Sequence, residues 1–352
     1  MYMQDFQTLW VREKIIDAIR IYFKGHGFHE VETPLLLPTP STEPFLEVFQ
    51  TKLKDDLGNT WPAFLPTSPE FALKKLLAAG SGSIFEITKS FRNGEGHSSR
   101  HNPEFSMAEW YEVGGDYMSV ASEMEKLMQF IWGKLQPTGS DLVGHKQATL
   151  RDLTLQYQGK TYDITAPWER ISVAEAFQKY AGIDVETMLD EQKLLVAARE
   201  KGYQVVAETT WEEMWNQIIA NEIEPKLGVE KPTILYDYPL AQAVLAKKKP
   251  SDPRFAERWE LFLGGLELAN CFSELTDWKE QEARCLENLV ERKQLGKTEF
   301  PMDTAFIDAL KKGMPECGGV ALGIDRLVML FTDSGNIDEV LTFPGSALFP
   351  QK

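Results

Sequence analysis

The segment Phe91–Tyr111 reads FRNGEGHSSRHNPEFSMAEWY, and its first two residues end an alternating stretch typical of a β-strand, SIFEITKSFR. Arg92 leads from that strand into a polar loop containing two glycines. An arginine at this point can direct paired donors at a carboxylate or a phosphate, and the glycines let the backbone approach a ligand closely. On this stretch alone, a surface arginine before a hairpin turn is the simpler interpretation.

The second half of the segment carries three more candidates. Phe105 is ordinarily a core residue, but an aromatic ring beside a loop of this size can also stack on a nucleotide base. Glu109 and Tyr111 lie two residues apart, so on a strand they project from the same face. A buried carboxylate beside a phenol could hold an ammonium group, and the alternative is an ordinary exposed pair.

A second cluster, ELANCFSELTD, runs from Glu267 to Asp277. Glu267 stands in an otherwise apolar strand, where an unpaired carboxylate is costly, so a cation or donor is expected opposite it. Glu274 follows seven residues later, which puts it on the opposite face of a regular strand unless the chain bends. Two converging carboxylates suit Mg²⁺ that carries substrate phosphates. A strand glutamate paired with an arginine explains the pattern as well.

A third cluster, GGVALGIDRLVML, passes from a short apolar strand into a helix. Gly323 marks the junction and permits close approach of the backbone. Arg326 lies one turn into the helix, where it could contact a phosphate. The chain has no Walker or Rossmann phosphate-binding fingerprint.

The composition restricts the possible classes of function. The 352 residues are 43% hydrophobic and carry a formal charge of −16, so nucleic acid is not the default partner. The three cysteines are odd in number and lack C-x-x-C spacing, which favours reduced thiols over disulfides or zinc. No apolar run has the length of a signal peptide or a membrane span. We therefore expect a cytoplasmic protein without membrane contact.

The order of elements favours an α+β fold with a mostly antiparallel sheet, because strands and helices do not alternate regularly. We expect one domain over residues 1–352, with a peripheral insertion near 136–165 and a helical segment at 172–227. The insertion contains a predicted hairpin that turns at Gly159. Ser68 is the expected N-cap of a helix that has Pro69 at its first position and Glu70 in its first turn.

Taken together, three motifs in order resemble the catalytic core of class II aminoacyl-tRNA synthetases of the lysine branch. VETP resembles the first, dimer-forming motif, FRN with HNPEF the second, and GIDRLVML the third. The resemblance covers nearly the whole chain. It implies a mostly antiparallel sheet flanked by helices, a homodimer, and the use of ATP and Mg²⁺.

A narrower resemblance is to the elongation factor P lysine ligases, which attach (R)-β-lysine to a lysine side chain of that factor. It rests on SPEFALKKLLAAG, NPEFSMAEWY, GVEKPTILYDYPLAQAVLA, ELANCFSELTD and GMPECGGVALGIDRLVML. Ala321 stands where these ligases carry alanine and the synthetases glycine. The sequence also starts at the catalytic core, so no anticodon-binding barrel is expected and tRNA is an improbable partner.

The resemblance assigns roles to individual residues. It implies that ATP is bound by Arg92, Asn93, Glu95, Asn102, Phe105, Glu267, Leu268, Gly323 and Arg326. It implies that lysine or β-lysine is bound by Ser68, Pro69, Glu70, Glu109, Tyr111, Glu274 and Ala321. Arg92 and Arg326 would be catalytic, and Glu267 and Glu274 would hold Mg²⁺. The implied reaction is adenylation of the amino acid followed by acyl transfer to elongation factor P.

Two other functions remain open. One is a lysyl-tRNA synthetase core without the anticodon-binding domain, which the hairpin near Gly159 favours because it resembles the synthetase branch. The other is a non-catalytic paralogue that senses an amino acid. Such a paralogue could lose its phosphate-handling residues, whereas Arg92, Glu267, Glu274 and Arg326 are all present.

Overall fold

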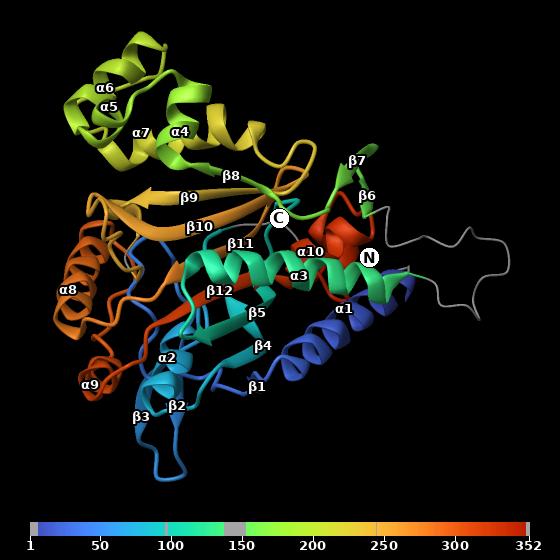
Figure 1. The fold of residues 1–352 in the computed structure, drawn as a ribbon. Helices are drawn as coiled ribbons and strands as arrows, with labels where there is room; N and C mark the ends of the chain where they lie inside the picture. The colour runs from blue at the N-terminus through green and yellow to red at the C-terminus, as the bar shows by residue number, and fades with distance from the viewer. Residues whose placement is uncertain (1–5, 96–97, 137–152, 244, 350–352) are drawn as a thin grey trace, which may run out of the picture.

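The computed structural model describes residues 6–95, 98–136, 153–243 and 245–349, and it is built around one eight-stranded sheet (Figure 1). In spatial order the strands are β1 (His29–Glu30), β4 (Ile84–Phe91), β5 (Glu104–Val113), β12 (Cys317–Gly323), β11 (Leu266–Ser273), β10 (Phe255–Leu263), β9 (Thr233–Pro239) and β8 (Glu169–Ser172). The pairs β1–β4 and β8–β9 are parallel and the other pairs are antiparallel. The predicted α+β class with a mostly antiparallel sheet is therefore confirmed.

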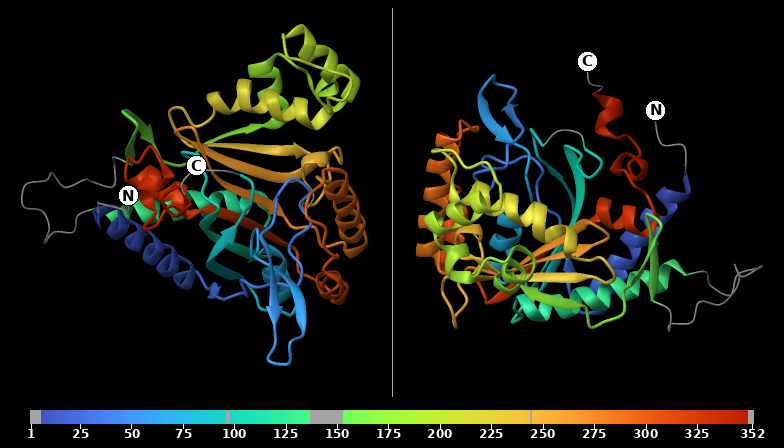
Figure 2. Two further views of the ribbon diagram at one scale, coloured as in Figure 1. Left: turned by 180° about the vertical axis from the view of Figure 1, so that it is seen from behind. Right: turned by 90° about the horizontal axis from the view of Figure 1, so that it is seen from above.

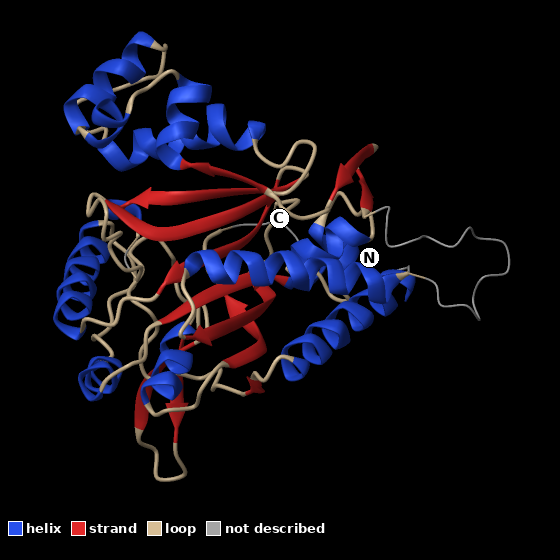
Figure 3. Cartoon of the chain, in the orientation of Figure 1, coloured by secondary structure: helices blue, strands red, loops and turns tan. Residues whose placement is uncertain are grey.

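Three helices cover one face of the sheet and form the main core with it. They are α1 (Phe6–Gly25), α3 (Tyr117–Leu135) and α10 (Ile324–Phe331), and Figure 3 shows them lying across the strands. Trp110 of β5 is fully buried in this core, and its indole ring lies 4.8 Å from the Phe23 ring of α1. Because strand side chains alternate, the neighbours Glu109 and Tyr111 point to the other face.

Helices α2 (Glu70–Ala78), α8 (Trp278–Gln294) and α9 (Thr304–Lys312) pack against a second apolar cluster. The Phe71 ring of α2 stacks on the Phe306 ring of α9 at 4.2 Å between centroids. The predicted start of α2 was wrong by one residue. Pro69 is the N-cap, and the Ser68 hydroxyl makes no capping hydrogen bond. The proline already supplies the helical φ, and its carbonyl accepts hydrogen bonds from the amides of Ala72 and Leu73.

The segment after β8 folds into short helices with an apolar cluster of their own, and Figure 2 shows them grouped at the edge of the sheet. They are α4 (Val173–Ala176), α5 (Val185–Leu189), α6 (Glu191–Glu200) and α7 (Trp211–Ile218). The division of the chain into one domain with an insertion remains a prediction.

The predicted hairpin at Gly159 is present as β6 (Thr154–Tyr157) and β7 (Lys160–Asp163). Its two turn residues, Gln158 and Gly159, both have positive φ, as a two-residue hairpin turn requires. The part of the predicted insertion at 137–152 lies outside the described residues. The remaining elements are the exposed hairpin of β2 (Gln50–Lys54) and β3 (Thr60–Phe64), and the C-terminal turn α11 (Gly345–Leu348).

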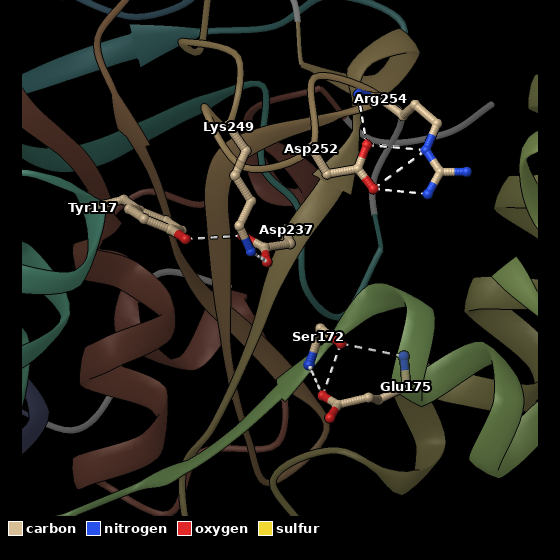
Figure 4. Close-up of polar contacts among 7 residues, drawn as sticks. All are labelled: Tyr117, Ser172, Glu175, Asp237, Lys249, Asp252 and Arg254. Atoms are coloured by element: carbon tan, nitrogen blue, oxygen red, sulfur yellow. Dashed lines mark hydrogen bonds and ion pairs between the residues drawn. The ribbon is translucent and has the colours of Figure 1, made fainter.

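Two polar contacts hold Asp237 of β9 in place (Figure 4). Tyr117 at the start of α3 donates a 2.9 Å hydrogen bond to Asp237 of β9, and Lys249 makes an ion pair with the same carboxylate. Asp237 has a φ of 60°, in the left-handed region, where the register between β9 and β10 is irregular. The two side chains therefore hold a residue whose backbone departs from regular strand geometry.

A buried ion pair fastens the first helix of the described chain to the last long one. Arg12 of α1 donates to Asp325 of α10 at 2.5 Å and to the Ser106 hydroxyl of β5 at 2.7 Å. The second Asp325 oxygen accepts the Ser106 backbone amide at 2.7 Å. Asp325 is thereby fully paired although only 3% of its side chain is exposed. In the described part of the chain, no helix combines the length and apolar character needed to span a membrane.

We predict that Arg12→Leu lowers the free energy of unfolding by about 3–5 kcal/mol, because it leaves the buried Asp325 carboxylate without its cation. Urea unfolding measures the change. The matched control is Arg20→Leu, which removes a half-exposed partner of Glu30 on the same helix and should cost about 1 kcal/mol or less. Equal costs for the two variants would contradict the role of the Arg12–Asp325 pair.

Candidate active site

A cavity of about 320 Å³ opens over strands β5, β11 and β12. It brings together most of the predicted site residues, which lie far apart in the sequence. These are Ser68, Glu70, Arg92, Glu95, Asn102, Phe105, Glu109, Tyr111, Glu267, Leu268, Glu274, Ala321, Gly323 and Arg326. Two predicted residues, Pro69 and Asn93, are not among those that line the cavity.

A β-bulge explains how two glutamates seven residues apart reach the same cavity. Along the β10–β11 ladder, Leu261 pairs with Ala269 but Phe262 pairs with Glu267, so Leu268 is an extra residue on β11. One extra residue moves the following side chains to the other face of a strand. The bulge therefore supplies the bend that a common face for Glu267 and Glu274 requires.

Behind one end of the cavity, a buried cation lies between two of the carboxylates that line it. Lys74 of α2 is 0% exposed, and its Nζ lies 2.5 Å from Glu70 Oε1 and 2.5 Å from Glu274 Oε2. Burial opposes the charge on Lys74, but the two carboxylates raise its pKa above the ordinary value. Burial raises the pKa of Glu274 to about 8 even though Lys74 lowers it. The single positive charge of Lys74 therefore does not fully compensate for the burial of Glu274.

Glu109 completes the acidic end. Tyr111 donates a 2.6 Å hydrogen bond to Glu109 Oε1, while Glu109 Oε2 is buried without a hydrogen-bond partner in the structure. Burial, followed by the nearby charges of Glu70 and Glu274, raises the pKa of Glu109 well above the ordinary carboxyl value. An unpartnered buried carboxylate oxygen that faces a cavity is suited to receive a cationic ligand.

Residue 319 is a glycine, and its lack of a side chain leaves room for Glu274 and Tyr111 at the acidic end of the cavity. In the antiparallel ladder Gly319 pairs with Tyr111, and Ala321 pairs with Glu109. A Cβ atom on Gly319 would overlap with Glu274 Oε1 and with the Tyr111 ring. At Gly323, by contrast, a Cβ atom would meet its nearest neighbour at 3.7 Å, so the protein itself leaves space there.

The other end of the cavity is basic and aromatic. The Arg92 guanidinium carbon lies 5.2 Å from the centre of the Phe105 ring, and Arg92 Nε is buried without a hydrogen-bond partner in the structure. The Glu95 carboxylate lies 3.6 Å from an Arg92 terminal nitrogen. A guanidinium with an unused buried donor can bind an anionic group that enters the cavity.

Arg326 lies in the same part of the cavity and is held from several sides. It donates to the Glu267 carbonyl at 2.7 Å and to the Glu267 carboxylate at 3.3 Å. Its other terminal nitrogen lies 3.0 Å from His101 Nε2, and burial together with the Arg326 charge lowers the pKa of His101. A neutral His101 can accept a hydrogen bond from Arg326, so this histidine orients the arginine.

Asn102 has a structural function that the sequence did not reveal. Its side-chain oxygen accepts the Gly345 amide at 2.8 Å, and its nitrogen donates to the Glu104 carbonyl at 2.5 Å. The amide thus ties the loop after Arg92 to the C-terminal segment, with one N–H left for a ligand. Asn93 is exposed and donates its backbone amide to the Glu47 carbonyl.

The residues that sequence reasoning missed at the site include Lys74, His101, Arg258, Asn270 and Gly319. Lys74 stands four residues after Glu70 on a helix, a spacing that indicates an ion pair but not its burial. Asn270 lines the cavity and has a buried side-chain oxygen without a hydrogen-bond partner in the structure, and Arg258 forms an ion pair with Glu260, which also lines the cavity. For Asn270 and Arg258 the sequence offered no pattern beyond their strand positions.

A divalent cation at this site would need coordinating atoms from a bound ligand as well as from the protein. Within the described residues, no group of three or more His, Cys, Asp or Glu side chains gathers as a metal site. Glu267 and Glu274 are both ion-paired, to Arg326 and Lys74, yet both line the cavity. Glu267 is 43% exposed and offers oxygen atoms of the kind that Mg²⁺ prefers when it also carries phosphates.

Comparisons with known proteins point to one family. Residues 3–347 match the family described as tRNA synthetases class II (D, K and N). The chain is 39% identical over 339 residues to a lysine–tRNA ligase of Magnetococcus marinus, covering 95% of this chain and 62% of that protein. It is also 39% identical over 339 residues to an elongation factor P–(R)-β-lysine ligase of Pseudoalteromonas translucida, covering 96% and 94%. A ligase of the same name from Mannheimia succiniciproducens is 36% identical, covering 96% and 94%.

The chain therefore spans about three fifths of the length of the lysine–tRNA ligase of Magnetococcus marinus, and a similar share of the one from Pelotomaculum thermopropionicum. The ligases named for elongation factor P match over nearly their whole length. All of these relatives are named for the ligation of lysine or β-lysine.

We predict that Gly319→Ala weakens the binding of L-lysine by at least about tenfold, because the new methyl group must displace Glu274 or Tyr111. Isothermal titration calorimetry measures the affinity. Gly133→Ala in α3, where a Cβ atom would meet nothing within 4 Å, is the control and should bind as the unmodified protein does. An unchanged affinity in Gly319→Ala would show that the acidic end does not bind the amino acid.

Proposed function

The chain belongs to the class II tRNA synthetase family of the D, K and N type, and we propose that it acts there as an ATP-dependent ligase for elongation factor P. It would activate (R)-β-lysine or lysine as an aminoacyl-adenylate and transfer the acyl group to a lysine side chain of the factor. The relatives named as such ligases support this proposal.

The charge balance of the acidic end is the observation that carries the proposal. Three buried carboxylates, Glu70, Glu109 and Glu274, face a single buried cation, Lys74. When all three carboxylates are ionised, two further positive charges neutralise the group. Lysine and β-lysine each bring two ammonium groups, so either substrate meets this requirement, whereas an amino acid with an uncharged side chain brings one.

Ala321 and the lysine run Lys247–Lys249 favour a protein acceptor over tRNA. Ala321 carries the methyl group expected of the ligases, beside Glu109 in the sheet. The three consecutive lysines form ion pairs with Glu316, Glu280 and Asp237, respectively. This basic segment is therefore already neutralised inside the protein and offers little attraction to a phosphate backbone.

At the basic end, the residues are suited to hold ATP. Arg92 would bind the α-phosphate and the substrate carboxylate with its unused donor, Phe105 would stack on adenine, and Arg326 would bind the outer phosphates. Glu267 and Glu274 would hold Mg²⁺, which when bound supplies positive charge next to the phosphates. Gly323 and Leu268 would form the wall against the nucleotide.

The chemistry requires positioning and neutralisation of charge but no nucleophilic side chain. The amino-acid carboxylate attacks the α-phosphorus in line and pyrophosphate leaves, while Arg92 holds both reacting groups as the negative charge develops. The unprotonated amine of the acceptor lysine then attacks the carbonyl carbon of the adenylate, AMP leaves, and the nitrogen gives up a proton to solvent. Glu70, Glu109 and Tyr111 would keep the substrate ammonium groups away from the reacting carboxylate.

A lysyl-tRNA synthetase activity is the second candidate, favoured by the β6–β7 hairpin that resembles the synthetase branch. From the resemblance we also expect a homodimer formed through the segment that contains VETP, and a cytoplasmic location. A non-catalytic sensor is the weakest alternative, because the phosphate-binding arginines and both candidate magnesium ligands line one cavity.

We predict that elongation factor P incubated with the protein, ATP, Mg²⁺ and (R)-β-lysine gains the mass of one β-lysyl group, with a smaller yield for L-lysine. Intact-mass spectrometry measures the product, and Arg92→Ala should abolish it. Transfer of lysine to tRNA without modification of the factor would establish the second candidate instead. Absence of amino-acid-dependent pyrophosphate exchange would favour the sensor.

A second prediction concerns pH. An ammonium group binds to an ionised carboxylate, and the pKa of Glu274 is about 8 in the free protein. The affinity for lysine should therefore rise from pH 6 to about pH 8.5 and fall again when the substrate amines lose their protons. Calorimetric titrations across this range measure the effect. A constant affinity from pH 6 to 8.5 would contradict binding at the buried carboxylates.

A further inference from the structure

Lys74 is the one residue of the acidic end that the proposed reaction does not use directly. It lies on the inner side of α2, 0% exposed, and contacts carboxylates from two separate elements. Glu70 belongs to its own helix, whereas Glu274 follows β11. A fully buried lysine is rare unless it is paired, so its position requires an explanation.

We propose that Lys74 is a positioning residue that serves as a permanent third cation of the amine site and thereby limits the site to two ammonium groups from the substrate. This inference deepens the proposed function and rests on it. Lys74 Nζ lies 2.5 Å from one oxygen of Glu70 and 2.5 Å from one oxygen of Glu274, whereas Glu109 Oε2 has neither a hydrogen bond nor an ion pair with another described residue.

The surrounding elements define the electrostatic environment of Lys74. The carboxylates that act on the cluster are Glu43, Glu70, Glu109 and Glu274, and the phenol is Tyr111. The nearby thiols are Cys271, Cys285 and Cys317, all with pKa values raised by burial, so they are neutral at ordinary pH. Among these groups, Lys74 is the cation in contact with Glu70 and Glu274.

The geometry also explains why a cation is needed at this position. Glu274 is fixed between Gly319, which leaves room for its Oε1, and the ammonium at its Oε2. Without Lys74, three carboxylates would share one buried end of the cavity, and neither Glu70 nor Glu274 would keep the cation that now lies 2.5 Å from each of them.

The test is a double-mutant cycle of Lys74→Met and Glu274→Gln, with the affinity for L-lysine measured by calorimetry in the absence of ATP. Lys74→Met alone should weaken binding at pH 7 by at least about tenfold. In the Glu274→Gln background the loss should be smaller, because one of the two carboxylates that Lys74 contacts no longer carries a charge.

The matched control is Lys75→Met. This lysine is the next residue on α2 and pairs with Asp303 outside the cavity. It should leave the affinity for L-lysine unchanged. Equal losses for Lys74→Met in both backgrounds would show that Lys74 acts through packing alone, and would overturn the proposal.

Thermal unfolding keeps the proposal testable if Lys74→Met folds poorly. Removing both charges should restore the melting temperature relative to Lys74→Met, and a double variant as unstable as the single one would overturn the inference. The two hypotheses can also be separated. If the unmodified protein binds neither L-lysine nor (R)-β-lysine, the proposed function fails, and the thermal cycle still decides the pairing of Lys74 with Glu274.

Discussion

Burial of carboxylates on one face of the sheet is the constraint on which the site depends. Each ionised carboxylate removed from water needs a cation or several donors, or else it binds a proton. Three local features answer this requirement: the Lys74 ammonium, the Tyr111 hydroxyl and the missing side chain at Gly319. The requirement is met incompletely, because Glu109 Oε2 has no hydrogen-bond partner in the structure, and this is the basis on which we propose that the cavity selects cations.

Recognition of the proposed substrates, lysine and β-lysine, therefore depends on both charge and shape. Lysine and β-lysine carry the same charges and differ in the carbon that bears one amine, so the acidic end cannot distinguish them by charge. The discrimination has to come from the walls, where Ala321 contributes a methyl group beside Glu109. One methyl group typically changes the selectivity between two ligands by only about 1–3 kcal/mol. A difference of this size is enough to make the site prefer one of the two amino acids but not to exclude the other.

The sequence predicted the strands that carry the site because their alternation and end residues are local properties. Neighbouring residues determine three of these features: the end of β4 just before Arg92, the shared face of Glu109 and Tyr111, and the turn at Gly159. From the sequence we could say only that Glu267 and Glu274 share a face if the chain bends between them. The bulge at Leu268 that provides this bend arises from pairing with β10. The burial of Lys74 was missed, since it depends on a partner from a distant strand.

Asn102 and Ser68 show a second limit. Motif positions invite an assignment to the ligand, yet the Asn102 amide is engaged by Gly345 and Glu104. The Ser68 hydroxyl, expected as a helix cap, instead lines the cavity without a partner. A polar side chain can serve either the ligand or the fold. Elements that are remote in sequence decide which of the two it does.

The Arg12–Asp325 contact joins residues that are 313 positions apart. A ribosome adding roughly 5–20 residues per second needs on the order of 15–60 s to synthesise that interval. During this time α1 has been made but lacks its final partner, and Ser106 on β5 lacks the carboxylate that fixes its amide. The nascent chain must therefore remain free of aggregation with its first amphipathic helix incompletely packed, which makes that helix a natural contact for a cellular chaperone.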